Sequence, residues 1–279
     1  MNRYSINLKD LIISIVRKCF IFNTLTRPII PFKVNLLYYK RTNGQQNVGD
    51  LLSLVIFKYL MRESKTRMWS LRTKRIAVVG SIIQFISAKT TIFGSGFLDM
   101  NSVQKFAKKT PQLCIKAVRG PLTAKYLARM GYIVPPVYGD PAILMPLIYP
   151  KKQKGNKIYD YIIIPHYSKL SKYQEKYDNV ISTLTDDWRT FIDTICAANF
   201  IISASLHGII LAETYGIPAI LLNDTESMDL FKYKDYYYST GRKKFFIANN
   251  VNEALNYKNQ IGVPCLLQQS NNLKKNFSI

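Results

Sequence analysis

Residues 200–223 read FIISASLHGIILAETYGIPAILLN, and their pattern decides the fold. FIISAS is short and apolar and predicts a buried strand, HGIILAETYG predicts a helix, and PAILLN predicts a second strand. A strand, a helix and a strand in this order form a crossover unit whose two strands lie parallel. The stretch therefore indicates a mostly parallel sheet with helices packed on it.

The same alternation extends over most of the chain. It predicts further strands and helices in VNLLYY (34–39), DLLSLVIFKYLM (50–61), RIAVVGS (75–81), TTIFGSGF (90–97), CIKAVRG (114–120), PLTAKYLARMG (121–131), YDYIIIP (159–165) and WRTFIDTICAA (188–198). Pro121 and Gly131 mark the start and the end of one of these helices. Between the two series, LIYPKKQKGNK (147–157) is basic and lacks a periodic apolar pattern, so we interpret it as a linker.

We therefore expect an α/β protein in which two Rossmann-like, doubly wound domains face a crevice. An amphipathic segment would span residues 1–31, the first domain 32–148, the linker 149–157 and the second domain 158–279. The last helix either stays in the second domain or returns to the first. In this architecture ligands bind beyond the carboxyl ends of the strands, where helix N-termini supply free N–H groups.

Charge and cysteine content narrow the choice of partner and compartment. The 39 Lys and Arg residues outnumber the 17 Asp and Glu residues, and the net charge of +22 favours an anionic partner such as phosphate, nucleic acid, acidic lipid or acidic glycan. The cysteines are Cys19, Cys114, Cys196 and Cys265. Because they form no C-x-x-C pair, we expect neither a metal finger nor a disulfide framework, and a reduced, cytoplasmic setting fits best.

The N-terminal segment carries a basic amphipathic pattern. Apolar residues recur there at helical spacing beside three basic ones: Leu8, Leu11, Ile12, Ile15, Val16 and Cys19 with Lys9, Arg17 and Lys18. Such a helix lies on a membrane surface or packs on the body of the protein, and the sequence leaves both alternatives open. No run reaches the roughly 18 uninterrupted apolar residues that a membrane span requires.

His207 stands at the junction between a predicted strand and a predicted helix, and it is one of two histidines in the chain. Ser203 and Ser205 supply hydroxyls beside it, and Gly208 lets a ligand approach the backbone closely. A histidine at such a junction caps or packs the helix, or it forms the centre of a site. The surrounding motifs must decide between these alternatives.

Short motifs accompany the histidine in a fixed order. They are NVGD (47–50), GSGF (94–97), VRGPLTA (118–124), GDPAILMP (139–146), SASLHGIILAETYGIPAI (203–220) and KYKDYYYSTGR (232–242). Together they resemble the polysaccharide pyruvyl transferase family, from about Val34 to Arg242. The resemblance implies a two-domain fold similar to GT-B glycosyltransferases. It also implies an enzyme that uses phosphoenolpyruvate to place a pyruvyl ketal on a sugar, without a further cofactor.

This chemistry needs a proton donor near neutral pH and cations for a carboxylate and a phosphate. Histidine has a suitable ordinary pKa, and the family's Leu-His-Gly histidine, which is associated with the donor site, matches His207. Whether His207 donates a proton or only binds the donor stays open. We place six further residues on the donor side: Arg119, Ser203, Ser205, Gly208, Lys234 and Arg242.

Arg119 is our choice for the anion clamp, because a guanidinium binds a carboxylate or phosphate through two parallel hydrogen bonds. The alternative is an arginine that bridges a helix to the sheet. Many family members carry an arginine two residues before the histidine, where this chain has Ser205. Because of that departure, we expect the contacts to the donor to come from Arg119, Lys234 and Arg242.

On the acceptor side we place Asn47, Gly49, Asp50, Gly94, Ser95 and His166. The first three resemble the family's N-terminal signature, although a helix N-cap alone would explain Asp50. We interpret GDP (139–141) as turn chemistry. Three tyrosines either stack on a sugar ring or lie in a half-buried strand or loop: Tyr236, Tyr237 and Tyr238. No His or Cys group at ligand spacing indicates a metal.

Two rival classes follow from the same features. A GT-B glycosyltransferase with a nucleotide-sugar donor would share the fold and the basic crevice. The charge alone suggests a nucleic-acid-binding protein, but no recognised motif appears and the basic residues are spread along the chain. Polysaccharide units of this kind are typically built on lipid carriers, so the resemblance implies a lipid-linked saccharide acceptor. It also implies a peripheral location on the anionic cytoplasmic face of the cell membrane.

Overall fold

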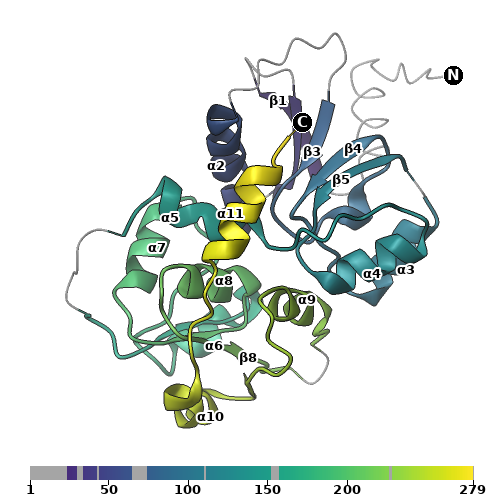
Figure 1. The fold of residues 1–279 in the computed structure, drawn as a ribbon. Coiled ribbons are helices and arrows are strands. Elements are labelled where there is room, and N and C mark those ends of the chain that lie inside the picture. Colours follow the sequence, from purple (N-terminus) through teal and green to yellow (C-terminus); the bar gives the residue numbers. More distant parts are fainter. Residues whose placement is uncertain are drawn as a thin grey trace, which may run out of the picture.

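The computed structural model describes residues 24–29, 34–42, 44–64, 74–109, 111–151, 157–225 and 228–278. It contains two sheets, one built from each half of the chain, with helices packed around them (Figure 1). This confirms the predicted α/β fold with two Rossmann-like sheets. The predicted N-terminal helix and the centre of the predicted linker lie outside the described residues, and the domain boundaries stay predictions.

The first sheet has five strands in the order β1, β2, β3, β4, β5. Their bounds are β1 Thr24–Ile29, β2 Val34–Tyr39, β3 Lys74–Ala77, β4 Thr90–Phe93 and β5 Leu113–Ala117. Strands β2 to β5 run parallel, as the alternation predicts, with Leu36 opposite Ile76 and Ile92 opposite Ile115. β1, which the pattern did not predict, pairs antiparallel with β2 at the edge of the sheet.

The second sheet has four parallel strands in the order β6, β7, β8, β9. Their bounds are β6 Ile162–Ile164, β7 Ile201–Ser203, β8 Ala219–Leu222 and β9 Ile247–Ala248. The first three confirm the strands predicted in YDYIIIP, FIISAS and PAILLN. The unit that opened the sequence analysis is therefore β7, helix α8 (Leu206–Thr214) and β8.

Helices and short 3-10 turns connect these strands. Their bounds are α2 Val48–Glu63, η1 Ile83–Phe85, α3 Met100–Ala107, α4 Pro121–Arg129, η2 Pro141–Leu144, α5 Met145–Ile148, η3 Tyr167–Lys169, α6 Leu170–Gln174, α7 Trp188–Cys196, α9 Phe231–Ser239, α10 Val251–Tyr257, η4 Lys258–Gln260 and α11 Leu267–Asn276. None of the helices in the described ranges is long and apolar enough to cross a bilayer.

The tyrosine-rich segment forms a helix, α9, so the strand or loop that the sequence left open for it is wrong. Tyr233, Tyr236 and Tyr237 are buried at helical spacing, and only Tyr238 is exposed, at 37%. Tyrosine favours strands, but here the spacing of three and four residues fills a helix face that packs on the core. The two buried members of the predicted stacking trio, Tyr236 and Tyr237, therefore present no face to a sugar.

Helix α8 lies at the centre of the molecule. Its residues Leu206, Ile209, Ile210 and Leu211 are all buried, and Figure 1 shows it near the middle of the ribbon. A helix that is apolar on all sides belongs inside a core. Because α8 cannot shift without disturbing this packing, the residues at its start are held rigidly.

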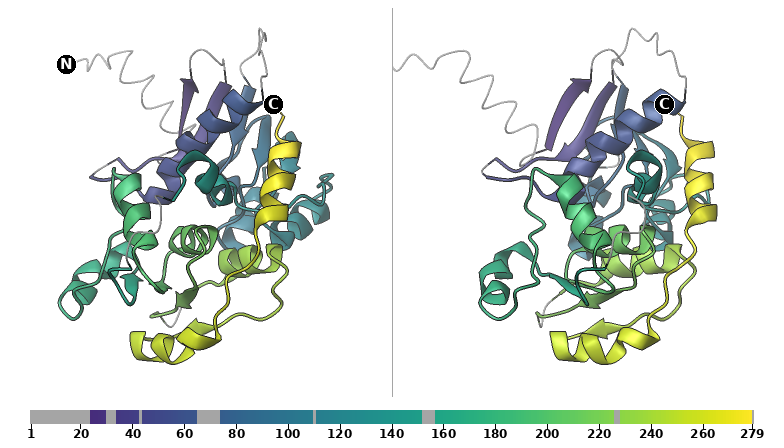
Figure 2. Two further views of the ribbon diagram at one scale, coloured as in Figure 1. Left: turned by 60° about the vertical axis from the view of Figure 1, so that its left-hand side comes forward. Right: turned by 90° about the vertical axis from the view of Figure 1, so that its left-hand side faces the viewer.

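Contacts of helices α9 and α11 are among those that join the two halves of the chain. Asp235 of α9 accepts hydrogen bonds from the backbone N–H groups of Leu122 and Thr123, at 2.9 and 3.0 Å, and so caps α4. Helix α11 runs along the outside from the second half to the first (Figure 2), and the ring of Phe277 packs edge-on against Phe93 with centroids 5.0 Å apart. These contacts hold the two sheets in a fixed relation.

Candidate active site

His207 lies between the start of α8 and the start of α2. A Cβ atom placed on Gly49 would lie 2.5 Å from Cγ and 2.6 Å from Cε1 of the imidazole, and closer still to Nδ1. The ring therefore occupies the space that the absent side chain of Gly49 leaves. On the other side of the ring, Nε2 lies 3.7 Å from Oδ2 of Asp140, and the His207 side chain is 13% exposed.

The second half of the chain holds the start of α2 in place. The N–H of Val48 donates to the carbonyl of Thr183 at 2.8 Å, and the N–H of Thr185 donates to the carbonyl of Gln46 at 2.9 Å. Asn47 is the N-cap, since its Oδ1 accepts from the N–H of Gly49 at 3.0 Å. The N-cap of α2 is therefore Asn47, while Asp50 points elsewhere.

Asp50 faces the same space as His207. Burial raises the pKa of its carboxyl from 3.8 to about 7, against the opposing influence of the nearby His207 and Lys232. A Cβ atom on Gly80, just beyond β3, would lie 3.9 Å from Oδ1 of Asp50. The carboxyl therefore sits at the carboxyl end of the first sheet, where this architecture binds ligands.

Lys232, in the first turn of α9, completes the group, although the sequence pattern did not single it out. Burial lowers the pKa of its ammonium from 10.5 to about 8, with repulsion from Arg119 as the next cause and Asp229, Asp99 and Asp50 opposing it. Within the part of the chain that the structure describes, Lys232 forms no hydrogen bond or ion pair, although acidic groups lie nearby. Its Nζ lies 4.9 Å from the centroid of the Tyr233 ring, and a largely desolvated cation without an ion-pair partner, close to Asp50, is suited to hold an anion.

The comparison with protein families agrees with the motifs around this site. Residues 17–225 match the family model described as polysaccharide pyruvyl transferase. The chain belongs to the polysaccharide pyruvyl transferase family.

Two known proteins are similar to this chain over part of their length. Uncharacterized protein L143 of Acanthamoeba polyphaga mimivirus is 32% identical over 169 residues, which are 57% of this chain and 57% of that protein. The succinoglycan biosynthesis protein ExoV of Rhizobium meliloti (strain 1021) is 27% identical over 219 residues, 73% of this chain and 64% of that protein. The matches thus span less than two thirds of either relative. No solved structure matches the chain.

Arg119, in the family motif VRGPLTA, is fully buried and fully engaged. Its Nη2 lies 3.1 Å from Oδ2 of Asp235, its Nη1 donates to Oγ of Ser81 at 2.7 Å, and its Nη2 donates to the carbonyl of Phe97. A Cβ on Gly96 would lie 2.5 Å from the guanidinium carbon, so the second glycine of GSGF makes room for this arginine. The geometry favours the alternative of a bridging arginine over direct contact with a donor.

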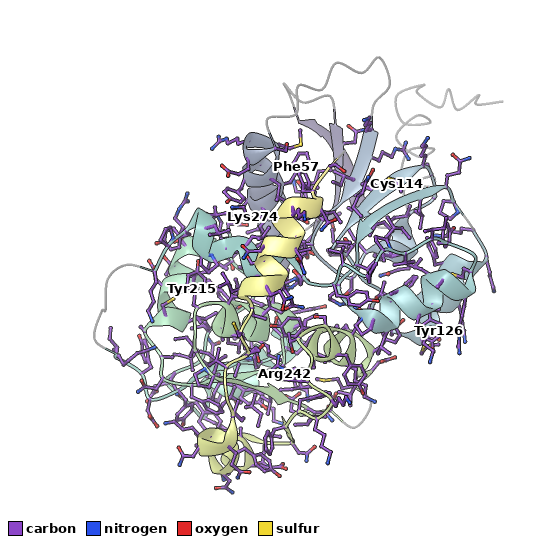
Figure 3. The ribbon with its side chains drawn as sticks, viewed as in Figure 1. Phe57, Cys114, Tyr126, Tyr215, Arg242 and Lys274 are labelled. Carbon is purple, nitrogen blue, oxygen red and sulfur yellow. The ribbon has the colours of Figure 1, made fainter. Side chains whose placement is uncertain are left out.

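Arg242 and Lys234, the other predicted donor cations, lie apart from the group around His207. Arg242 donates to both carboxylate oxygens of Glu213, at 2.6 and 2.8 Å, and lies over the ring of Tyr237 at 4.4 Å in the second half of the chain (Figure 3). Lys234 is exposed on α9. Of the lysines in KYKDYYYSTGR it is Lys232, two residues earlier, that faces the site.

Ser203 supports the loop rather than facing solvent. Its buried hydroxyl accepts from the N–H of Ser205 at 3.0 Å and donates to the Ser205 carbonyl at 2.9 Å. A Cβ on Gly208 would overlap Ser203 Oγ, so packing alone requires a glycine here, and its predicted role in the approach of a ligand stays a prediction. Ser205 precedes α8 without a side-chain cap, which leaves the first N–H groups of this helix without a side-chain partner there.

Two of the predicted acceptor-side residues also serve the fold. Gly94 has φ of 88°, in the left-handed region, and a Cβ there would overlap Pro141. Ser95 is fully buried and donates to the carbonyl of Val78 at 3.1 Å. Their roles in this structure are a tight turn and a buried hydrogen bond.

His166 is exposed at the end of β6. Its Nδ1 lies 2.7 Å from Oγ of Ser168, and its ring packs on Tyr167 with centroids 4.3 Å apart. The guanidinium of Arg41 lies over the ring of Tyr167, 5.0 Å from its centroid. This contact joins the two halves of the chain at the surface. Burial lowers the pKa of His166, and Lys232 is the next cause, so the two side chains lie within electrostatic reach.

The structure thus brings together four titratable side chains and one glycine: His207, Asp50, Asp140, Lys232 and Gly49. His166 stands at their edge. Among the described residues, no group of three or more His, Cys, Asp or Glu side chains is placed to hold a metal ion. The thiols of Cys114, Cys196 and Cys265 are free.

Proposed function

We propose that the chain transfers the pyruvyl group of phosphoenolpyruvate to a sugar of a cell-surface or extracellular polysaccharide repeat unit, where it forms a pyruvate ketal. Membership of the polysaccharide pyruvyl transferase family supports the reaction class. One observation carries the proposal on the structural side: a histidine, a carboxyl group of raised pKa and a lysine of lowered pKa converge where the two halves meet.

The reaction has two bond-forming steps. An acid protonates the methylene carbon of the enol phosphate, which creates an oxocarbenium-like centre at C2, and one sugar hydroxyl attacks there and gives up its proton. Inorganic phosphate then leaves with the C2–O electron pair. A neighbouring hydroxyl attacks C2 and loses its proton to the phosphate or to a base, so that a diol and phosphoenolpyruvate become a ketal and phosphate.

The side chains present fit these tasks. His207 acts as the acid or binds the donor, and the adjacent Asp50, with a pKa of about 7, can take or supply a proton at neutral pH. Lys232 and the uncapped start of α8 offer positive charge and N–H groups to the carboxylate and phosphate of the donor. Because Arg119 and Arg242 are already paired with carboxylates, Lys232 takes over the role that the sequence assigned to them.

The alternative is a GT-B glycosyltransferase that uses a nucleotide-sugar. Two facing sheets with the site between them are compatible with this class as well. Thermal unfolding separates the two: phosphoenolpyruvate should raise the melting temperature, because a ligand at 100 times its Kd stabilises the folded state by about 2.7 kcal/mol. Stabilisation by a nucleotide-sugar, and none by phosphoenolpyruvate, would favour the glycosyltransferase.

The acceptor is proposed to be lipid-linked, and the enzyme to act on the cytoplasmic face of the cell membrane. The net charge of +22 supports attraction to anionic lipid, where each Lys or Arg close to the surface contributes about 1 kcal/mol. The naming of ExoV as a succinoglycan biosynthesis protein is consistent with a role in making an exported polysaccharide.

Flotation with anionic liposomes at low and high salt tests this location. The full chain should float at low salt and not at high salt, and the combined substitution Lys9→Gln, Arg17→Gln and Lys18→Gln should weaken binding. A control with the same loss of charge combines Lys172→Gln, Lys243→Gln and Lys244→Gln, all exposed in the second half. Equal losses in the two variants would remove the N-terminal segment from the proposal, and no flotation at low salt would remove the membrane.

A further inference from the structure

Two buried polar atoms of the site face each other without forming a hydrogen bond. Within the described residues, Nε2 of His207 and Oδ2 of Asp140 are both buried and have no hydrogen-bond partner, and they lie 3.7 Å apart. A buried polar group without a partner destabilises a fold unless an interaction compensates it. The atoms placed to compensate each other are these two.

Asp140 is held rigidly enough to orient a neighbour. Its other oxygen, Oδ1, accepts from the N–H of Ala142 at 3.0 Å and so caps the turn η2. The side chain is 1% exposed, and the preceding Gly139 has φ of 147°, a conformation that side-chain-bearing residues rarely adopt. Since Oδ1 is used for the cap, Oδ2 is left to face the imidazole.

The imidazole is held at one edge and against one face. Its Nε2 edge points at Asp140, while Gly49 packs against the face of the ring near Nδ1, where a Cβ would collide with the ring. Asp50 lies on the α2 side and influences the ring electrostatically, and Lys232 influences Asp50 in turn from α9. If Nε2 carries the proton that faces Asp140, the nitrogen left to handle a substrate proton is Nδ1.

We propose that Asp140 is a positioning residue for His207: it accepts the Nε2–H of the imidazole and thereby directs Nδ1 to the reacting groups. This assignment goes beyond the turn chemistry that the GDP motif indicates by itself. Its predicted effect on turnover rests on the proposed function. Its structural claim, that Nε2 of His207 carries the proton, can be tested without any enzymatic activity.

The substitution Asp140→Asn separates orientation from capping. The asparagine keeps a carbonyl oxygen for the N–H of Ala142, but it presents an NH₂ donor to His207 in place of an acceptor. The neutral imidazole must then turn its lone pair toward that donor and carry its proton on Nδ1. Asp187→Asn is the matched control, because Asp187 is also an N-cap, accepts from the N–H groups of Arg189 and Thr190, and is exposed on α7.

Nitrogen NMR of histidine-labelled protein reads the tautomer directly. The chain has two histidines, so a His166→Asn background leaves His207 as the single labelled ring. At about pH 8.5, above the ordinary histidine pKa of about 6.5, His207 should carry its proton on Nε2. The proton should move to Nδ1 in Asp140→Asn and stay on Nε2 in Asp187→Asn. An Nδ1–H tautomer in the otherwise unchanged protein would overturn the proposal, whether or not the variants fold.

Kinetics give the second readout. With phosphoenolpyruvate and an accepted glycoside, Asp140→Asn should lower kcat by about 10²–10⁴-fold, the range for a misdirected general acid or base, with the KM for phosphoenolpyruvate changed only a few-fold. Asp187→Asn should leave both constants unchanged. If the protein does not turn over phosphoenolpyruvate at all, the proposed function fails while the tautomer still decides the role of Asp140. An altered tautomer with unchanged kcat would reject the positioning role.

Discussion

Gly49→Ala is the substitution that probes the contact between α2 and His207 most sharply. The added methyl group would lie 2.5 Å from Cγ and 2.6 Å from Cε1 of the imidazole, about 1 Å short of the roughly 3.5–4.0 Å at which carbon atoms pack. The start of α2 cannot easily withdraw, because Val48 and Gln46 are hydrogen-bonded to the second half of the chain. The imidazole must therefore leave its place or the two halves must separate.

The expected magnitude follows from two opposing effects. Overpacking a filled site costs about 1–3 kcal/mol, whereas alanine stabilises a helix relative to glycine by up to about 1 kcal/mol. In the otherwise unchanged protein the first effect should dominate and Gly49→Ala should destabilise. In a His207→Ala background the methyl group meets no ring, so the same substitution should be neutral or stabilising. We expect a coupling of about 2–3 kcal/mol between the two positions.

Chemical denaturation of the four proteins in this cycle measures that coupling. Turnover of phosphoenolpyruvate should fall in Gly49→Ala as well, because the displaced ring no longer faces the reacting atoms. Gly262→Ala is the control, since no atom lies within 4 Å of a Cβ placed there. If Gly49→Ala changes the free energy of unfolding equally with and without His207, the ring does not lie over Gly49 and our description of the site is wrong.

Three further substitutions test the remaining parts of the site. Lys232→Met should raise the KM for phosphoenolpyruvate at least tenfold. Lys234→Met, on the exposed face of the same helix, should change this KM little, and equal effects of the two substitutions would contradict a specific role of Lys232 in donor binding. Asp50→Asn should stabilise the protein at pH 8 but not below about pH 4. The pKa of Asp50 is about 7 in the folded protein and 3.8 as the ordinary value, so the protonated carboxyl favours folding at low pH. This stabilisation is lost as the pH rises through 7, and its upper limit is about 4 kcal/mol. Unfolding curves that give the same difference at both pH values would contradict the burial of this carboxyl. Asp235→Ala should lower the free energy of unfolding by about 3–5 kcal/mol, because it leaves Arg119 buried and unpaired and uncaps α4, and a loss below 1 kcal/mol would refute the bridging role.

Local periodicity predicted the sheets well because each strand–helix unit carries its own apolar pattern. VNLLYY and FIISAS became β2 and β7 with little change of bounds. β9, of two residues, is too short to show a pattern, and β1 is an edge strand whose pairing is antiparallel. The assignment of α9 failed because tyrosines fit strands by propensity, whereas their spacing fits a helix, and burial against α4 and the core decided between the two.

The candidate site was predicted less completely, for a different physical reason. His207 could be found because its motif is contiguous. The partner of Arg119 is Asp235, 116 residues later, and no local pattern shows that this arginine is neutralised. Local patterns also could not show that Lys232 faces the site, because its direction depends on the helical phase of α9. Nor could they show that Asp140 approaches His207, because that contact depends on how η2 packs against α8.

Pyruvyl transfer is tested most directly by measuring phosphate release from phosphoenolpyruvate, with product analysis, in the presence of a panel of lipid-linked or synthetic glycosides. We expect acceptor-dependent release with a pyruvylated product, and a loss of about 10²–10⁴-fold in a folded His207→Ala variant whose unfolding curve is otherwise ordinary. Near-normal release by that variant, or glycosyl transfer from a nucleotide-sugar in place of pyruvyl transfer, would contradict these expectations.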